Sequence, residues 1–302
     1  SIYTIPLIFQ SQKFAEKIIK SLKVRSTAKK PAYSFSRWEQ LARTIERVSD
    51  PIKVGIVGKY FDTGEFILED SYISVIEAIK HAAWECGRNP QIQWIDSGKL
   101  EKSRNALDEL KNYDGIIVPG GFGSRGVEGK IQAIEYVRKN NIPYLGLCYG
   151  MQLAVVEFAR HILGKKDAHT EEINPKTKNP VIHILPEQKK LLRAKSYGAS
   201  MRLGAYNCRL QKGSKARALY GKETISERHR HRYEFNNTYR ADIEKAGLMV
   251  SGVNVERDLV EIVELTNHPF FVGVQFHPEF KSRPLSPHPL FLGLIKAGIQ
   301  KK

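Results

Sequence analysis

Short apolar runs alternate with segments of helical spacing between residues 51 and 163, and this alternation constrains the fold most strongly. The first run, 53–58, is rich in Val and Ile, which is typical of a strand buried in a parallel sheet. Because the connections are short, consecutive strands are expected to pair in parallel through helical crossovers. The pattern predicts an α/β fold with a doubly wound, mainly parallel sheet flanked by helices. The predicted strands are 53–58, 91–96, 114–118 and 142–147, and the predicted helices are 71–86, 129–139 and 151–163.

The remainder of the chain has a weaker pattern. Residues 165–240 are polar and basic without clear periodicity, and we expect loop-rich structure there. Two apolar runs, 248–256 and 259–265, predict a hairpin, and 271–276 predicts a last apolar strand.

The first 50 residues differ from the rest of the chain. Apolar side chains recur at helical spacing twice, with a basic stretch at Lys29, Lys30 and Pro31 that is expected to be a linker. We therefore divide the chain into a helical extension, 1–50, and a main domain, 51–302. The two helical stripes are Phe14, Ile18, Ile19 and Leu22, and Trp38, Leu41, Ala42 and Ile45.

Composition limits the possible classes of protein. No apolar run reaches the ~18–20 residues needed to span a bilayer, and the N-terminus lacks signal-peptide order. Without an initiator Met, Ser1 is expected to be a cut or processed end. The net charge of +16 is scattered and accompanies no nucleic-acid-binding motif, so we expect no nucleic-acid or membrane partner. Three widely spaced cysteines, in no metal-ligand spacing, predict a reducing cytoplasm and no metal site.

The strongest motif is Gly146-Leu147-Cys148-Tyr149-Gly150, between a predicted strand and a predicted helix. It is the nucleophile-elbow pattern with Cys in place of Ser. Small residues are needed on both sides because the turn is tight, and the following helix N-terminus favours a thiolate. Cys148 is therefore a candidate nucleophile, the alternative being a buried Cys in a glycine-bounded turn.

Two further segments favour the catalytic interpretation. A Cys nucleophile needs a base and the base needs an orienting group, and His277 and Glu279 fit these roles after the last predicted strand. The turn 119–123 brings glycines just before the elbow strand, where backbone N–H groups could stabilise an oxyanion. The residues thus predict a Cys-His-Glu hydrolase or acyltransferase, but they do not identify its substrate.

Several longer phrases resemble the class I glutamine amidotransferases, and most closely the glutaminase domains of CTP synthases, over most of residues 52–295. The run at 228–232, Arg-His-Arg-His-Arg, is more specific than the triad. Residues 1–7 look like the seam that joins the family's synthetase domain to its glutaminase domain, so 1–50 would be a helical linker from a missing synthetase domain. The matching phrases are at 57–60, 119–123, 125–130, 146–152, 201–204, 227–234 and 275–280.

The resemblance implies roles for individual residues. Cys148 would attack the amide of L-glutamine, with His277 and Glu279 completing the triad. Gly121 and the backbone N–H of Tyr149 would form the oxyanion hole, and Glu172 and Arg232 would hold the α-amino and α-carboxylate groups with the Tyr233 backbone. The remaining substrate contacts would be Tyr149, Gly150, Met151 and Gln152, and the GTP-responsive lid, 122–129, would include Arg125, Gly126 and Glu128.

The sequence also departs from the family. Tyr149 replaces a commonly aliphatic residue, 197–200 replaces a Gly-Gly-Thr-Met-like phrase, and 61–69 lengthens a loop. No Gly-x-x-x-x-Gly-Lys-Ser/Thr phosphate loop occurs, so the half that binds ATP and UTP is expected to be absent.

By resemblance, the whole enzyme would be a cytoplasmic homotetrameric ligase of pyrimidine biosynthesis that uses ATP and Mg and responds to GTP. This domain would need no cofactor and would not make CTP alone. Two alternatives stay open: a non-catalytic regulatory or assembly module, and a free-standing γ-glutamyl hydrolase.

Overall fold

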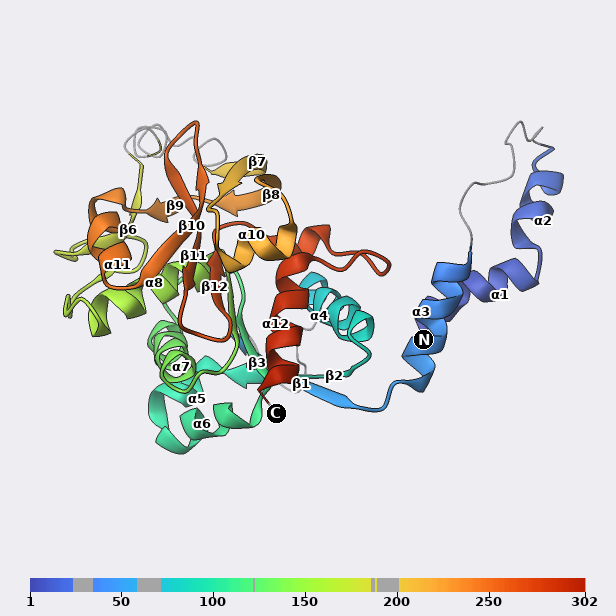
Figure 1. Cartoon of the computed structure of the whole chain (residues 1–302), viewed down its shortest axis with the longest axis horizontal. Helices are drawn as coiled ribbons and strands as arrows, with labels where there is room; N and C mark the ends of the chain where they lie inside the picture. Colours follow the sequence, from blue (N-terminus) through green and yellow to red (C-terminus); the bar gives the residue numbers. More distant parts are fainter. Residues whose placement is uncertain (24–34, 59–71, 122, 186–187, 189–200, 302) are drawn as a thin grey trace.

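A nine-stranded sheet forms the centre of the protein (Figure 1). The computed structural model describes residues 1–23, 35–58, 72–121, 123–185, 188 and 201–301. The first five strands of the sheet pair in parallel and the other four add antiparallel. In spatial order the strands are β2 (Asn89–Asp96), β1 (Pro51–Gly58), β3 (Gly115–Val118), β4 (Tyr144–Leu147), β12 (Phe271–Val274), β11 (Leu259–Leu265), β10 (Leu248–Asn254), β7 (Arg202–Leu210) and β8 (Thr224–His231).

Helices cover both faces of the parallel half, and this confirms the predicted fold class. Along β3, Ile116 and Val118 face a core built with α7 and α8, whereas Ile117 faces a core built with α4 and α12. This alternation follows from the two-residue period of a strand and explains why the runs are apolar throughout. The helices are α4 (Ile73–Glu85), α5 (Ser97–Lys102), α6 (Arg104–Asp108), α7 (Val127–Lys139), α8 (Tyr149–His161), α10 (Lys215–Tyr220), α11 (Arg240–Lys245) and α12 (Pro289–Gln300).

The expectation of loop-rich structure at 165–240 is wrong. β7 and β8 pair over their length as an extension of the central sheet. A second sheet contains β5 (His169–Thr170), β6 (Pro180–Ile184) and β9 (Tyr233–Phe235). Strand β8 was not predicted because no alternation of apolar residues marks it. Its buried side chains are mostly polar, among them Glu227, His229 and His231.

The N-terminal segment forms η1 (Ile2–Thr4), α1 (Ile5–Ser11), α2 (Phe14–Ser21) and α3 (Ser36–Arg47). Tyr3 and Leu41 pack with Trp84 of α4 in a small buried cluster. The apolar side chains of α1 and α2, such as Phe9 and Ile18, are exposed. Among the described helices, none is both long and apolar enough to cross a membrane.

Three sequence predictions lie outside the described residues: the linker at Lys29–Pro31, the loop at 61–69 and the phrase at 197–200. The division of the chain at residue 50 stays a prediction.

The carboxyl ends of β3, β4 and β12 meet at one edge of the sheet. Val118 pairs with Gly146, and Leu147 pairs with Val274, so the three strands end together. The glycine turn, the elbow and the segment leading to His277 each follow one of these strands. In parallel sheets this edge is where ligands bind.

Candidate active site

Cys148 lies in a strained elbow between β4 and α8. Its backbone adopts φ 51° and ψ −99°, a conformation that a residue with a side chain rarely takes. The backbone N–H of Cys148 donates to the carbonyl of Val274 over 2.6 Å, which fixes the elbow to β12. Cys148 is buried, with only 5% of its surface exposed, and it precedes the first turn of α8.

The glycines around Cys148 are required by close backbone approaches. A Cβ atom on Gly150 would lie 2.1 Å from the carbonyl oxygen of Val118, and one on Gly146 would lie 2.8 Å from the carbonyl carbon of Gly150. Gly120 is constrained by a side chain instead, because a Cβ atom there would lie 2.9 Å from Cε1 of His277. The same point is 3.6 Å from Cβ of Cys148, so Gly120 leaves room for the two side chains to approach each other.

His277 and Glu279 form the expected pair. Nδ1 of His277 lies 2.7 Å from Oε1 of Glu279. The backbone N–H of His277 donates to the carbonyl of Arg228 on β8 over 2.8 Å, and its ring stacks on Phe280 with centroids 5.3 Å apart. Three contacts therefore fix the imidazole of His277: the backbone hydrogen bond to Arg228, the stacking of the ring on Phe280 and the contact of Nδ1 with Glu279.

The charges around His277 favour its protonated form. Burial lowers the pKa of His277, but interactions with Cys148 and Glu279 raise it more, so the net pKa is above its ordinary value. The other ring nitrogen, Nε2, is buried and has no hydrogen-bond partner among the described residues. This arrangement suits an imidazolium that pairs with a thiolate and delivers a proton to a leaving group.

The two predicted oxyanion donors follow β3 and Cys148. Gly121 lies just beyond β3, and Tyr149 is the first residue of α8, where backbone N–H groups lack helical partners. Lys130 of α7 is buried beside them, with Nζ 3.9 Å from the Cβ position of Gly121 and 5.4 Å from the ring centroid of Tyr149. Lys130 was not predicted as a site residue, although it lies within the family phrase at 125–130.

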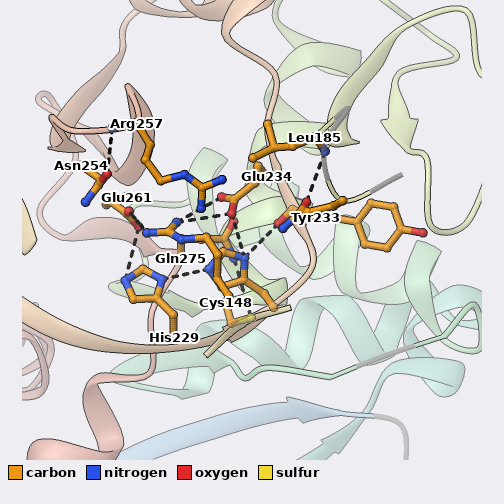
Figure 2. A network of polar contacts seen from close by, with 12 residues as sticks. Cys148, Leu185, His229, Tyr233, Glu234, Asn254, Arg257, Glu261 and Gln275 are labelled. Atoms are coloured by element: carbon orange, nitrogen blue, oxygen red, sulfur yellow. Dashed lines mark hydrogen bonds and ion pairs between the residues drawn. The ribbon is translucent and has the colours of Figure 1, made fainter. Parts of the chain in front are cut away.

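Gln275 was also missed as a site residue. Figure 2 shows its amide beside Cys148, where Nε2 donates to Sγ over 3.7 Å. Its Oε1 accepts from Nε2 of Gln152 over 3.2 Å, and the same Gln152 nitrogen donates to the carbonyl of Tyr233 over 2.9 Å. Two signals were available, because Gln275 lies two residues before His277 and begins the family phrase at 275–280.

The predicted glutamine-binding residues gather around Tyr233. Burial and the Glu172 carboxylate raise the pKa of the Tyr233 hydroxyl, and the Arg232 guanidinium lowers it, so both charged groups lie near this side chain. Glu172 also accepts the backbone N–H of Gly123 over 3.4 Å. Arg232 is exposed. Glu172 and Arg232 thus both act on the Tyr233 hydroxyl, with opposite effects on its pKa.

The other predicted substrate contacts are buried. Gly150 and Met151 are enclosed, the latter against Gly273 of β12, which leaves mainly their backbone atoms for a substrate. The Tyr149 hydroxyl is buried without a hydrogen-bond partner among the described residues. Its pKa is raised by burial and by the carboxylates of Glu172 and Glu128.

The predicted lid joins the start of α7. Gly126 has φ 71° and precedes the helix, and Arg125 before it is exposed. Glu128 in the first turn forms an ion pair of 2.7 Å with Arg160 of α8. This end of the lid is therefore attached to the main body.

A buried charged network lies behind Gln275 (Figure 2). Arg202 of β7 lies between two enclosed carboxylates, with Nη2 2.8 Å from Oε1 of Glu261 and Nη1 3.3 Å from Oε1 of Glu234. Nδ1 of His229 lies 2.8 Å from Nε2 of His231. The network connects to the site because the carbonyl of Glu261 accepts the backbone N–H of Gln275.

Among the described residues, one acidic group could hold a metal ion: Glu135, Glu157 and His161, near the ends of α7 and α8. Arg138 and Lys139 already pair with its two carboxylates. The group therefore gives no reason to expect a metal.

The chain is similar to known proteins over most of its length. Residues 67–297 match the family model described as glutamine amidotransferase class-I. The chain is 45% identical over 302 residues to CTP synthase of Listeria innocua and 48% identical over 295 residues to CTP synthase of Sulfurisphaera tokodaii. These alignments include 100% and 98% of this chain, but 54% and 53% of the relatives. The chain thus spans about half the length of the curated relatives it matches.

A solved structure is similar over the same region. The glutaminase domain of Trypanosoma brucei CTPS, with bound acivicin, is 38% identical with a TM-score of 0.75. The match covers 83% of this chain and 95% of that one.

Proposed function

We propose that this chain, which belongs to the class-I glutamine amidotransferase family and resembles its CTP synthase glutaminase domains, hydrolyses glutamine to glutamate and ammonia. Cys148 is the proposed nucleophile, with His277 as its acid and base and Glu279 as the orienting carboxylate. The observation that carries this proposal is the meeting of a strained Cys148 elbow with the hydrogen-bonded His277–Glu279 pair.

In the first half-reaction, the Cys148 thiolate attacks the side-chain carbonyl carbon of glutamine. The carbonyl oxygen becomes an oxyanion, which the backbone N–H groups of Gly121 and Tyr149 would stabilise. His277 then gives its Nε2 proton to the amide nitrogen, the C–N bond breaks, and ammonia leaves a γ-glutamyl thioester on Cys148.

In the second half-reaction, His277 is neutral and can act as a base. It takes a proton from water as the water oxygen attacks the thioester carbonyl. The carbon–sulfur bond breaks, glutamate leaves, and the thiolate–imidazolium pair is restored. Glu279 holds Nδ1 through both steps and stabilises the charge on the ring.

The charged residues around Tyr233 would select the amino acid. Glu172 would bind the α-amino group and Arg232 the α-carboxylate, as the proximity of both groups to Tyr233 supports. A carboxylate and a guanidinium placed apart match the two charges of free glutamine.

The ammonia would serve a synthetase domain, which we expect outside the part of CTP synthases that this chain matches. It would aminate UTP to CTP with ATP and Mg, in a homotetramer that responds to GTP through the lid at Arg125, Gly126 and Glu128. A cytoplasmic location would suit three cysteines that form no disulfide. The intact Cys148–His277–Glu279 geometry favours this function over a non-catalytic module.

A steady-state assay of this 302-residue chain tests the proposal. We expect slow release of ammonia and glutamate from glutamine, little stimulation by GTP, and no CTP from UTP, ATP and glutamine. Absence of glutamine hydrolysis in a folded sample, both alone and with the synthetase part added, would contradict the glutaminase assignment. Strong activation by GTP would instead show that the regulatory site is complete within this chain.

A further inference from the structure

Hydrogen bonds between side chains connect the N-terminal segment to the turn that carries Glu279. Tyr3 of η1 donates its hydroxyl proton to the carboxylate of Glu77, and its oxygen lies 3.0 Å from Nε2 of His81. The other ring nitrogen of His81, Nδ1, lies 3.1 Å from Oγ of Ser282. Tyr3, His81 and Ser282 are all buried, so water does not readily substitute for these partners.

The direction of each hydrogen bond follows from the available protons. Because the Tyr3 proton goes to Glu77, the Tyr3 oxygen accepts from Nε2–H of His81. A neutral imidazole carries one N–H, so Nδ1 of His81 accepts from the Ser282 hydroxyl. Oγ of Ser282 in turn accepts the backbone N–H of His288 over 3.3 Å. Tyr3, His81 and Ser282 therefore each donate one hydrogen bond and accept another, and the donors and acceptors can be assigned in only one way.

The surroundings of His81 favour its neutral imidazole form. Burial lowers the pKa of His81, and the nearby cations Arg283 and Lys80 lower it further, whereas only Glu77 opposes them. The single N–H that the hydrogen bonds require is therefore the favoured state near neutral pH.

Ser282 ends the turn that presents Glu279. This turn, η5 (Pro278–Lys281), directly follows His277 and has Ser282 as its C-terminal cap. Phe280 in the turn stacks on the His277 ring, and Arg283 donates to the carbonyls of Phe280 and Ser282 over 2.9 and 2.7 Å. A shift of Ser282 would therefore move the segment that aligns His277 and Glu279.

The other end of the series depends on how the N-terminal segment is seated. Nε1 of Trp38 in α3 donates to the carbonyl of Tyr3 over 2.7 Å, and the Tyr3 ring packs edge-on against Trp84 of α4 at 4.9 Å. We propose that Tyr3 and His81 are positioning residues through which the seating of the N-terminal segment controls the alignment of Glu279 with His277, and hence the reactivity of Cys148. The proposal rests on the proposed function for its catalytic consequence only.

If Glu279 is no longer aligned with His277, Cys148 should react only at higher pH. Glu279 stabilises the His277 imidazolium, and the imidazolium stabilises the thiolate, so a displaced carboxylate delays thiolate formation to higher pH. Among the described residues, His229 and His231 also interact electrostatically with His277, and burial lowers the pKa of each, so both stay neutral. These two histidines should therefore not obscure a shift in the pH dependence of Cys148 alkylation.

The test measures the pH dependence of Cys148 alkylation by iodoacetamide, quantified on the Cys148 peptide, with kcat and KM for glutamine. Tyr3→Phe and Ser282→Ala remove one hydroxyl from each end of the series, and the double variant removes both. Tyr113→Phe is the matched control, because its hydroxyl bonds Gln93 over 2.8 Å and belongs to another part of the fold.

We expect Tyr3→Phe and Ser282→Ala each to move the alkylation midpoint upward by about one pH unit, the size of a weakened ion-pair contact. kcat should fall about tenfold with KM nearly unchanged, the double variant should match the singles, and Tyr113→Phe should resemble the parent.

Folded variants with the parent's pH profile, or effects that add in the double variant, would overturn the proposal. If Tyr3→Phe does not fold, Ser282→Ala alone decides, because it leaves the N-terminal packing intact. A shifted alkylation profile in a chain that does not hydrolyse glutamine would refute the proposed function but support the positioning role.

Discussion

The side-chain amide of Gln275 donates to the thiol of Cys148, and the two residues directly follow the neighbouring parallel strands β12 and β4. Its oxygen is occupied by Gln152, so the amide orientation is set and an N–H faces the sulfur. A fixed donor at this place can hold a thiolate in one rotamer and stabilise its charge.

Replacing Gln275 should slow the reaction without removing it. We expect Gln275→Leu to lower kcat for glutamine hydrolysis about tenfold, corresponding to about 1.4 kcal/mol of lost stabilisation. The control is Gln211→Leu, at an exposed position between β7 and α10. An unchanged rate of Cys148 alkylation and hydrolysis in Gln275→Leu would show that this contact has no catalytic role.

The negative charge of Glu279, as well as its position, should contribute to catalysis. Glu279→Gln can keep a hydrogen bond to Nδ1 of His277 but removes the negative charge that raises the His277 pKa. We expect kcat to fall about 10²–10⁴-fold and the pH–rate profile to move to higher pH, because the ion pair with Cys148 forms less readily. Glu256→Gln, an exposed carboxylate, should change neither quantity. Full activity of Glu279→Gln would exclude the triad.

The elbow glycines should be critical for stability. A methyl group on Gly150 would collide with the carbonyl of Val118, whose backbone belongs to β3 and cannot move independently. We therefore expect Gly150→Ala to lower the free energy of unfolding by about 3 kcal/mol, measured by urea denaturation. Gly98→Ala is the control, since the nearest atom to its Cβ position is the Asp96 side chain at 3.3 Å. Equal stability of the two variants would contradict the described packing.

The elbow was predictable because its constraint is local. Gly146, Cys148 and Gly150 are adjacent in sequence, and the contacts that exclude larger side chains involve the same turn and the neighbouring strand. His277 and Glu279 were predictable for a related reason, since the carboxyl end of a parallel strand places its following residues at one edge of the sheet.

The buried network was not predictable from pattern. Arg202, Glu234 and Glu261 are charged residues that sequence reasoning assigns to a surface, yet each is almost fully enclosed. Their burial depends on pairing across β7, β9 and β11, which is visible only once the strands are arranged. The strand β8 was hidden for a related reason, because its buried residues Glu227, His229 and His231 are polar.

This network predicts a specific dependence of stability on pH. Burial, together with the neighbouring Glu261, raises the pKa of Glu234 to about 8, although Arg202 opposes this shift. Between the ordinary carboxyl pKa and about 8, the native state binds more protons at Glu234 than the unfolded state, so stability falls as pH rises.

We therefore expect Glu234→Gln to gain stability relative to the parent as pH increases from 5 to about 8, by about 1 kcal/mol or more. Urea denaturation at several pH values measures the difference between the two proteins. Glu244→Gln, at a partly exposed carboxylate that pairs with Arg240 on α11, is the control. A pH-independent difference would mean that Glu234 is ionised throughout.

Covalent labelling tests most directly whether Cys148 is the nucleophile of a glutaminase. A glutamine-mimicking diazo-ketone should attach once per chain, and mass spectrometry of the digested protein should place the label on Cys148, with glutaminase activity lost in proportion. Cys148→Ala should remain folded, take no label and release no ammonia. A label on Cys86 or Cys208, or continued glutamine hydrolysis by Cys148→Ala, would contradict the account.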